Sequence, residues 1–344
     1  MMKPWLNRRT LFALLVIMVL SLNAGWQAWA ERHREEVRDW RTALQLRLQE
    51  WFPEELLPTG NDYGFQNGEG KAAPQVVLLH GLDEPGGIWD DLLPALRAEG
   101  VTAWPFRYPN DQAIELSADF LAEEWRTLPR DTEVVLVGHS MGGLVIRDFV
   151  TRHHLGLADE SGGPEIRGVI LVGTPNHGSE WARFRIWLEV REQFARMQRG
   201  EFTLLGALRE GTGAANIDLR PESAFLEKLN ARPWPQSVPL RIIGGLIAEP
   251  TDIMNTSLGF LERELGEDAL TVADGLRDWW GGIGDALGDG VVPVESLVLQ
   301  DAPAPLLLSA THRGLLARRD AGQPEPPAIR PILELLCEWG VVAD

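Results

Sequence analysis

The chain has 344 residues, and 44% of them are hydrophobic, which is enough to bury a large core. Fifty acidic residues against 32 basic ones give a formal net charge of −18. Such a surface repels phosphate backbones, so we expect no nucleic-acid partner. Cys337 is the single cysteine, which excludes an intramolecular disulfide framework and a paired-cysteine metal site.

Residues 1–30 are predicted to be a signal peptide or an N-terminal membrane anchor. Arg8 and Arg9 precede an apolar run over Leu11–Leu22, which is the order found in export signals. The apolar run is short and the segment ends in Ala28-Trp-Ala30, and both features favour a cleaved signal peptide.

Two other features favour a retained anchor. The stretch 11–30 is long enough to span a bilayer, and Trp26 and Trp29 suit the membrane–water interface. In either case the positive charges stay in the cytoplasm and the rest of the chain crosses the membrane. We therefore expect a cell-envelope protein, anchored through its N-terminal segment, or a secreted or periplasmic one if the signal is cleaved.

Residues 31–73 are expected to form a connecting helix and linker. Apolar residues recur there at spacings of three and four, which predicts a helix over Glu31–Trp51. That helix either packs on the main domain or lies on a membrane. The apolar positions are Val37, Trp40, Leu44, Leu48 and Trp51.

Residues 74–344 show the alternation of strands and helices that is typical of an α/β domain. Helical runs such as 111–126 separate short apolar runs, so we predict a mostly parallel sheet with helices on both faces. In such a sheet, functional residues collect at the carboxyl ends of the strands. The predicted strands are Gln75–Leu79, Val101–Pro105, Glu133–Val137, Val169–Val172, Leu240–Ile243 and Leu306–Ser309.

Two insertions interrupt this alternation. Residues 179–239 carry apolar and charged residues at helical spacing, which predicts an inserted helical cap over the functional edge of the sheet. Trp181, with Phe184 and Trp187, would give this cap an apolar entrance. Residues 247–288 form a second insertion, which the sequence does not place in the fold.

The segment Gly138-His-Ser-Met-Gly142 carries the strongest functional signal. It follows the apolar strand Glu133–Val137 and precedes a helix-forming segment from Leu144. A Gly-x-Ser-x-Gly sequence between strand and helix is the nucleophile elbow of a serine hydrolase, because small residues permit the sharp turn that exposes the serine. We therefore predict that Ser140 is a nucleophile.

A serine hydroxyl needs a histidine to take its proton and a carboxylate to orient that histidine. In hydrolases with this elbow, the acid and then the histidine follow the serine along the chain. His153 and His154 would lie at the end of the helix away from Ser140, and His177 in a loop that lines the site. His312 follows the last predicted strand, and we predict that it is the base.

The acid is chosen among Asp285, Asp289, Glu295 and Asp301. Asp289 lies in Gly288-Asp-Gly-Val-Val-Pro293, where flanking glycines permit a tight turn and an apolar run fixes the loop. Asp301 precedes a proline and looks solvated, whereas Asp285 lies in another glycine-rich loop and is the rival. We predict that Asp289 orients the base.

The remaining site residues follow from the same chemistry. An oxyanion needs two backbone N–H donors, and the expected ones belong to Leu82 and Met141. His80, His177 and Trp181 are expected to contact substrate, although His80 has a structural role as its alternative.

Several motifs together resemble the bacterial lipase and PGAP1-like esterase group of α/β hydrolases, over about Pro74–His312. This resemblance implies carboxylic ester hydrolysis through an acyl-enzyme, with acyl or lipid esters as substrates and no cofactor. Some related lipases hold a structural calcium, but no specific ligand set for one is present here. The motifs are His80-Gly81-Leu82, Gly138-His-Ser-Met-Gly142, Val172-Gly-Thr-Pro-Asn-His-Gly178, Pro221-Glu-Ser-Ala-Phe-Leu226 with Leu229-Asn230, and Gly288-Asp-Gly-Val-Val-Pro293.

Two alternatives remain open from sequence. The same triad can cleave thioesters or amides, because it serves acyl transfer in general. A binding protein could also keep the hydrolase fold without turnover. Retention of Ser140, Asp289 and His312 favours an enzyme over that scaffold.

Overall fold

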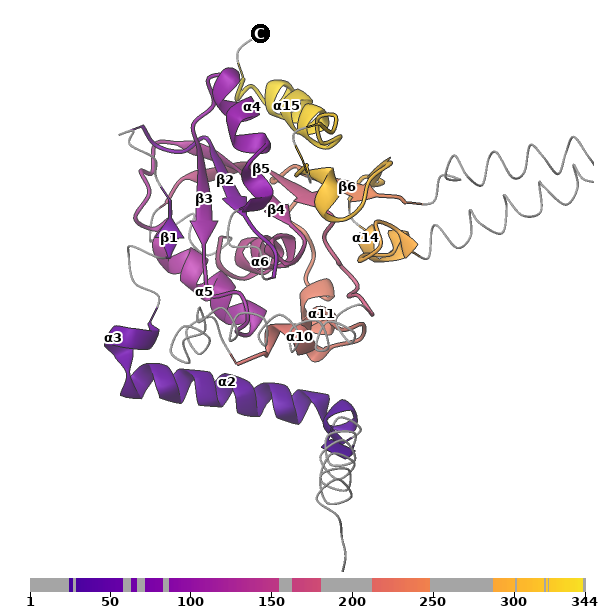
Figure 1. Ribbon diagram of the computed structural model, residues 1–344. Helices are drawn as coiled ribbons and strands as arrows, with labels where there is room; N and C mark the ends of the chain where they lie inside the picture. The colour runs from indigo at the N-terminus through magenta and orange to yellow at the C-terminus, as the bar shows by residue number, and fades with distance from the viewer. Residues whose placement is uncertain are drawn as a thin grey trace, which may run out of the picture.

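The computed structural model describes residues 25–26, 29–57, 63–66, 72–82, 87–154, 163–180, 212–247, 287–300, 302–318, 320 and 322–342. In this part of the chain, seven strands form one sheet with the order β1-β3-β2-β4-β5-β6-β7 (Figure 1). β1 pairs with β3 in antiparallel fashion, and every other neighbouring pair is parallel. The mostly parallel sheet that the alternation predicted is confirmed.

Six of the strands fall where short apolar runs predicted them. The exception is β1, which lies in the segment 31–73, where the sequence predicted a helix and a linker and no strand was identified. A two-residue edge strand is too short to show an alternating pattern. The strands are β1 Gly64–Phe65, β2 Val76–Leu79, β3 Ala103–Arg107, β4 Glu133–His139, β5 Glu165–Val172, β6 Leu240–Gly245 and β7 Leu306–Leu308.

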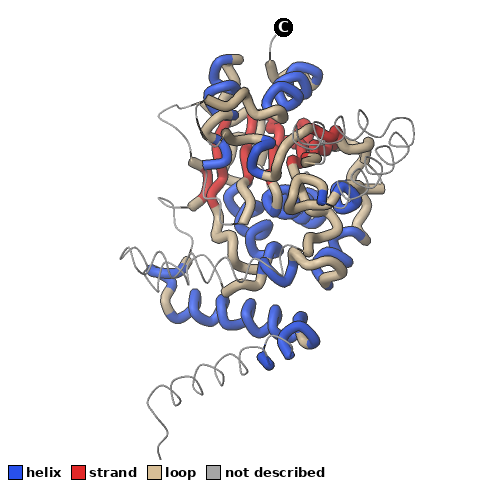
Figure 2. The backbone as a smooth tube through the Cα atoms, turned by 45° about the vertical axis from the view of Figure 1, so that its right-hand side comes forward, coloured by secondary structure: helices blue, strands red, loops and turns tan. Residues whose placement is uncertain are grey.

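Helices cover both faces of the sheet (Figure 2). Successive residues of a strand point to opposite faces, so Val77 and Leu79 of β2 pack into one core cluster and Val76 and Leu78 into another. All four side chains are fully buried, and each such burial stabilises the fold by about 1.5–3 kcal/mol.

The helices divide between these two clusters. α5 Ile114–Trp125, α6 Met141–Phe149 and α11 Ala224–Asn230 contribute to the first, and α4 Leu92–Ala98 and α15 Ile329–Glu338 to the second. Shorter elements complete the chain. They are η1 Gly87–Trp89, η2 Val150–His154, α10 Ala215–Asp218, α14 Val294–Leu297 and η3 Arg313–Leu315.

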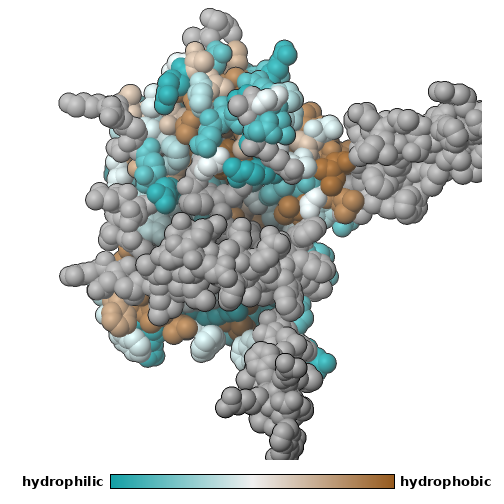
Figure 3. Space-filling view, viewed as in Figure 1, coloured by the Kyte–Doolittle hydropathy of each residue, from teal (hydrophilic) through white to brown (hydrophobic). Residues whose placement is uncertain are grey.

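The connecting helix is confirmed as α2 Arg34–Trp51, which the short α3 Pro53–Leu56 follows. α2 lies across one end of the molecule, next to α10 (Figure 1). Its apolar spacing predicted the helix, but Trp40 and Trp51 are each 62% exposed. Apolar side chains therefore reach the surface at the α2–α3 corner (Figure 3).

Charged contacts hold α2 against the domain. Arg38 is buried, and its Nε donates to Asp218 Oδ1 at 2.6 Å while one terminal nitrogen donates to Glu115 at 2.7 Å. The other oxygen of Asp218 accepts from the Ile114 backbone N–H at 2.9 Å. Asp218 thus links α10, α2 and the start of α5.

Several sequence expectations fall outside the described residues. They include the apolar run Leu11–Leu22, most of the predicted cap between 181 and 211, and most of the second insertion, between 248 and 286. Within the described residues, no helix has the length and apolar character needed to cross a membrane. The described end of the cap segment holds α10 and α11, as helical spacing predicted.

Asp218→Asn should destabilise the protein by about 1–3 kcal/mol, because it removes the more buried of the two carboxylates that bond the Arg38 guanidinium and leaves Glu115 as its partner. The measurement is urea unfolding at pH 8. Burial raises the pKa of Asp218 to about 6, although the charge of Arg38 opposes this shift, so Asp218 is ionised at pH 8. Asp39→Asn is the control. The Asp39 carboxylate is exposed and lies 3.5 Å from Arg38, farther than the 2.6 Å of Asp218. Its replacement should change the free energy of unfolding by less than about 0.5 kcal/mol. Equal changes in the free energy of unfolding for Asp218→Asn and Asp39→Asn would contradict the role of Asp218 as a stabilising partner of Arg38.

Candidate active site

Ser140 occupies the turn between β4 and α6, with φ 54° and ψ −126°. A positive φ is unfavourable for a residue with a side chain, and such strain persists only where surrounding structure enforces it. Here the Ser140 N–H donates to the Val172 carbonyl at 2.9 Å, and its carbonyl accepts from the Gly143 N–H at 3.1 Å. The strained backbone is thus held from both sides.

The two glycines of the motif are required by close backbone approach. A Cβ at Gly142 would lie 2.2 Å from the Leu79 carbonyl oxygen, and one at Gly138 would lie 2.6 Å from the Gly143 nitrogen. Neither neighbour is a flexible side chain that could move away. The turn therefore tolerates no larger residue at either position.

Asp289, which is buried, and His312, which is half-buried, form a pair at the carboxyl edge of the sheet. His312 Nδ1 lies 2.7 Å from Asp289 Oδ2, and the His312 N–H donates to the Asp289 carbonyl at 2.9 Å. The other carboxylate oxygen accepts from the backbone N–H groups of Val291 and Val292, at 2.9 and 2.8 Å. Because these bonds use Oδ1, Oδ2 is left to the imidazole, and Nδ1 carries the shared proton.

The His312–Asp289 pair lies beside the elbow. A Cβ at Gly173, which directly follows β5, would lie 3.1 Å from His312 Nδ1 and 3.2 Å from Asp289 Oδ2. The ring of His139, next to Ser140, lies 4.7 Å from the His312 ring. The hydrogen bonds among the described residues do not include one from Ser140 Oγ to His312. Catalytic hydrogen bonds of this kind are often long before substrate binds.

The rival acids and bases have other surroundings. Glu295 is exposed on α14, and Asp285 and Asp301 lie outside the described residues. His153 pairs with Asp119, with 2.8 Å between Nε2 and Oδ1, beyond the end of α6. The His154 side chain is not among those described.

The expected oxyanion donors adjoin the elbow. Met141 is the first residue of α6, where a backbone N–H has no acceptor within the helix. Leu82 is buried in the loop after β2, and a Cβ at neighbouring Gly81 would lie 2.8 Å from Ser140 Cβ. This loop therefore packs directly on Ser140, while the roles of Leu82 and Met141 as donors stay a prediction.

The three predicted substrate contacts have different placements. His80 is buried, stacks on Tyr108 with ring centroids 4.6 Å apart, and donates from Nδ1 to the Gly81 carbonyl at 2.8 Å. Tyr108 in turn donates its hydroxyl to the His80 carbonyl, and burial raises the pKa of that hydroxyl. These contacts favour the alternative role of His80, which is to position the loop that carries Leu82.

His177 is exposed, and its Nε2 lies 3.0 Å from the Val298 carbonyl. It lines a side pocket rather than the surroundings of Ser140. Trp181 lies outside the described residues. Contact of His177 and Trp181 with substrate stays a prediction.

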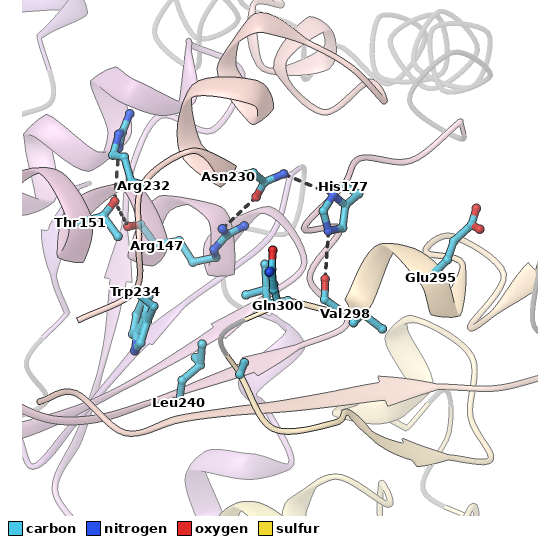
Figure 4. A pocket seen from close by; sticks show the side chains of 12 residues that line it. Arg147, Thr151, His177, Asn230, Arg232, Trp234, Leu240, Glu295, Val298 and Gln300 are labelled. Carbon is cyan, nitrogen blue, oxygen red and sulfur yellow. Dashed lines mark hydrogen bonds between the residues drawn. The ribbon is translucent and has the colours of Figure 1, made fainter. Parts of the chain in front are cut away.

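Sequence reasoning missed Arg147, two turns along α6 from Ser140. Its side chain is buried, and one terminal nitrogen donates to the Asn230 amide oxygen at 2.9 Å (Figure 4). The other terminal nitrogen donates to the Asn176 amide oxygen at 3.2 Å. Burial, and then the charge of Arg232, lower the pKa of Arg147 to about 9. The available signal was a charged pair, Arg147 and Asp148, within an otherwise apolar helical run.

The described residues hold no cluster of three or more histidine, cysteine or acidic side chains that could bind a metal. This result covers the side chains of the described residues and no other part of the chain.

Comparison with known proteins identifies the fold family. Residues 76–331 match the model of the "Alpha/beta hydrolase family", and no curated protein gives a significant sequence match. Three solved structures are similar in fold, and each match covers 80% of this chain. The metagenomic carboxyl esterase MGS0156 has a TM-score of 0.51, with 19% identity over 77% of its chain.

Two lipases give lower scores. The mature lipase BlEst2 of Bacillus licheniformis has a TM-score of 0.49, with 18% identity over 99% of its chain. The lipase of Staphylococcus hyicus has a TM-score of 0.48, with 14% identity over 97% of its chain. At such identities a structural likeness concerns the fold, and the PGAP1-like resemblance stays an interpretation of motifs. Because the family model spans well over half of the sequence, the chain belongs to the alpha/beta hydrolase family.

Proposed function

We propose that this protein is a serine hydrolase that cleaves carboxylic esters of acyl or lipid type through an acyl-enzyme intermediate. The observation that supports the proposal is the hydrogen-bonded Asp289–His312 pair beside the strained serine elbow. A carboxylate bonded to Nδ1 leaves Nε2 as the proton-accepting nitrogen of the imidazole. That is the state a general base needs.

In the proposed reaction, Ser140 Oγ attacks the acyl carbon while His312 takes the hydroxyl proton. The resulting oxyanion accepts hydrogen bonds from the Leu82 and Met141 N–H groups. The carbon–oxygen bond to the leaving alcohol then breaks as His312 returns the proton to that alcohol. A water, deprotonated by the same histidine, finally cleaves the acyl-serine and releases the acid.

Alternative bonds use the same machinery, so substrate class requires direct comparison. Thioesters and amides place a similar carbonyl before the serine, and a non-catalytic hydrolase-fold protein would turn over none of the three. Ester, thioester and amide substrates of matched acyl length should be assayed on one preparation. The proposal expects the highest kcat/KM for the ester.

Ser140→Ala and His312→Ala should each lower kcat for p-nitrophenyl esters by about 10⁴-fold or more, because nucleophile and base act as one unit. The double variant should be no worse than about tenfold below either single variant. Acyl chains of increasing length then separate an esterase from a lipase. Full activity in Ser140→Ala would overturn the proposal.

Asp289→Asn tests the orienting role while it preserves the turn. The amide oxygen can still accept from Val291 and Val292, whose N–H groups bond Oδ1 in the native turn. The amide nitrogen would then face His312 Nδ1 and favour the wrong tautomer, so kcat should fall by about 10⁴-fold with little change in stability. Retention of more than about a tenth of the activity would exclude Asp289 as the acid.

Gly81→Ala should lower kcat/KM by at least about tenfold, because its Cβ would meet Ser140 Cβ at 2.8 Å and displace the elbow or the Leu82 loop. Gly322→Ala is the matched control, since the nearest atom to its Cβ is 3.5 Å away. Steady-state kinetics on both variants checks the claim. Equal kcat/KM values for Gly81→Ala and Gly322→Ala would show that the position of the Leu82 loop does not affect catalysis.

We further propose a location in the cell envelope, held by the N-terminal segment or reached after its cleavage. The basic residues followed by the apolar run Leu11–Leu22 support this proposal. Fractionation of cells that express the full chain, beside a chain that begins at Glu31, tests it. Recovery of both chains in the cytoplasm would contradict an envelope location.

A further inference from the structure

A pocket of about 360 Å³ lies beside α6, apart from the proposed catalytic residues. Ser140, Asp289 and His312 do not line it, and Arg147, which does, lies about 10 Å along the helix axis from Ser140. Figure 4 shows Arg147, Asn230 and His177 side by side in this pocket. The polar lining residues are Arg147, Thr151, His177, Asn230, Arg232, Glu295 and Gln300.

Arg147 brings a buried positive charge that no carboxylate of the described chain neutralises. Its residue is only 4% exposed, its terminal nitrogens bond the neutral amides of Asn176 and Asn230, and its Nε has no hydrogen-bond partner among the described residues. A buried guanidinium with only neutral partners is costly, because burial removes it from water without supplying a counter-charge.

The nearest buried carboxylate is already occupied. Asp148 accepts from Arg152 through Oδ2 at 2.6 Å and from Arg232 through Oδ1 at 2.5 Å. Arg152 also pairs with Asp119 at 2.6 Å. The two cations Arg152 and Arg232 are thus paired with the two carboxylates Asp119 and Asp148. Arg147 is the cation of this group that makes no ion pair with a described carboxylate.

The rest of the lining indicates the kind of anion. Trp234, Leu240, Leu299 and Ala302 supply an apolar wall, which suits a ligand with a hydrocarbon part. Glu295 is exposed on α14 and adds one negative charge to the lining, so beside Arg147 the pocket favours a monoanion over a doubly charged phosphate. Guanidinium groups also match the planar geometry of carboxylates.

We propose that this pocket binds the carboxylate of a short apolar acid, with Arg147 as its counter-ion and the Trp234–Leu240 wall around its hydrocarbon chain. This second site does not depend on the proposed hydrolase activity, because no atom of Ser140 takes part. It also gives a purpose to Asn176, in the loop after β5, and Asn230, at the end of α11, which hold the guanidinium from two sides.

The test is calorimetric titration of octanoate into the full chain. Wild-type protein and Ser140→Ala should both bind at one saturable site with equal affinity, because Ser140 does not line the pocket. Octanol, with the same chain and no charge, should bind at least about tenfold more weakly, because the recognised feature is the carboxylate. Inorganic phosphate should bind more weakly than octanoate.

Two variants test the location. Arg147→Met removes the charge at similar length, and Ala302→Trp fills the pocket and leaves Arg147 in place. Each should weaken octanoate binding at least about tenfold, and circular dichroism reports whether each variant is folded. If Arg147→Met does not fold, Ala302→Trp decides the location.

Four results would overturn the inference. They are the absence of saturable octanoate binding, equal affinity for octanol, wild-type affinity in folded Arg147→Met or in Ala302→Trp, and a preference for phosphate. Loss of octanoate binding in Ser140→Ala would instead assign it to the catalytic centre and would also overturn the second site. If the hydrolase proposal failed, each of these binding results would still carry the same meaning for the second site.

Discussion

The strained backbone of Ser140 is the constraint on which the rest of the proposed site depends. Strain of this kind costs on the order of 1–3 kcal/mol, and it persists only where the surroundings leave no relaxed alternative. Here the carbonyl of Val172 holds the Ser140 N–H, and Gly142 packs against the end of β2. The parallel pairing of β2, β4 and β5 is therefore what exposes the serine.

The same edge of the sheet gathers the other parts of the site. Gly173 follows β5 and lies between the elbow and the His312–Asp289 pair. His312 belongs to the loop after β7, and Asp289 to the loop before α14. Each polar group is fixed by backbone hydrogen bonds, so the site is preorganised by rigid elements rather than by long side chains. Hydrolysis needs groups held in this way before substrate arrives.

Much of this arrangement could be predicted from sequence because its physical signals are local. Apolar runs marked six strands, and the spacing within Gly138-His-Ser-Met-Gly142 marked the elbow. Asp289 was separable from Glu295 because glycines flank it, and the structure shows Asp289 paired with His312. The roles of these residues in catalysis remain proposals.

The remainder was beyond sequence because its signals are long-range. β1 is defined only by its pairing with β3, and a two-residue strand has no period of its own. The spacing of α2 predicted a helix but not which face would be buried, since Arg38 is drawn inward by Asp218, 180 positions away along the chain. Arg147 likewise acquires its surroundings from Asn176, in the loop after β5, and Asn230, at the end of α11.

Covalent labelling with a fluorophosphonate tests the central claim most directly, because the reagent transfers its phosphonyl group to a serine oxygen that an adjacent base has activated. The account predicts one adduct, located on Ser140 by peptide mass spectrometry and lost in folded His312→Ala. An adduct on another residue, or none on folded wild-type protein, would contradict it.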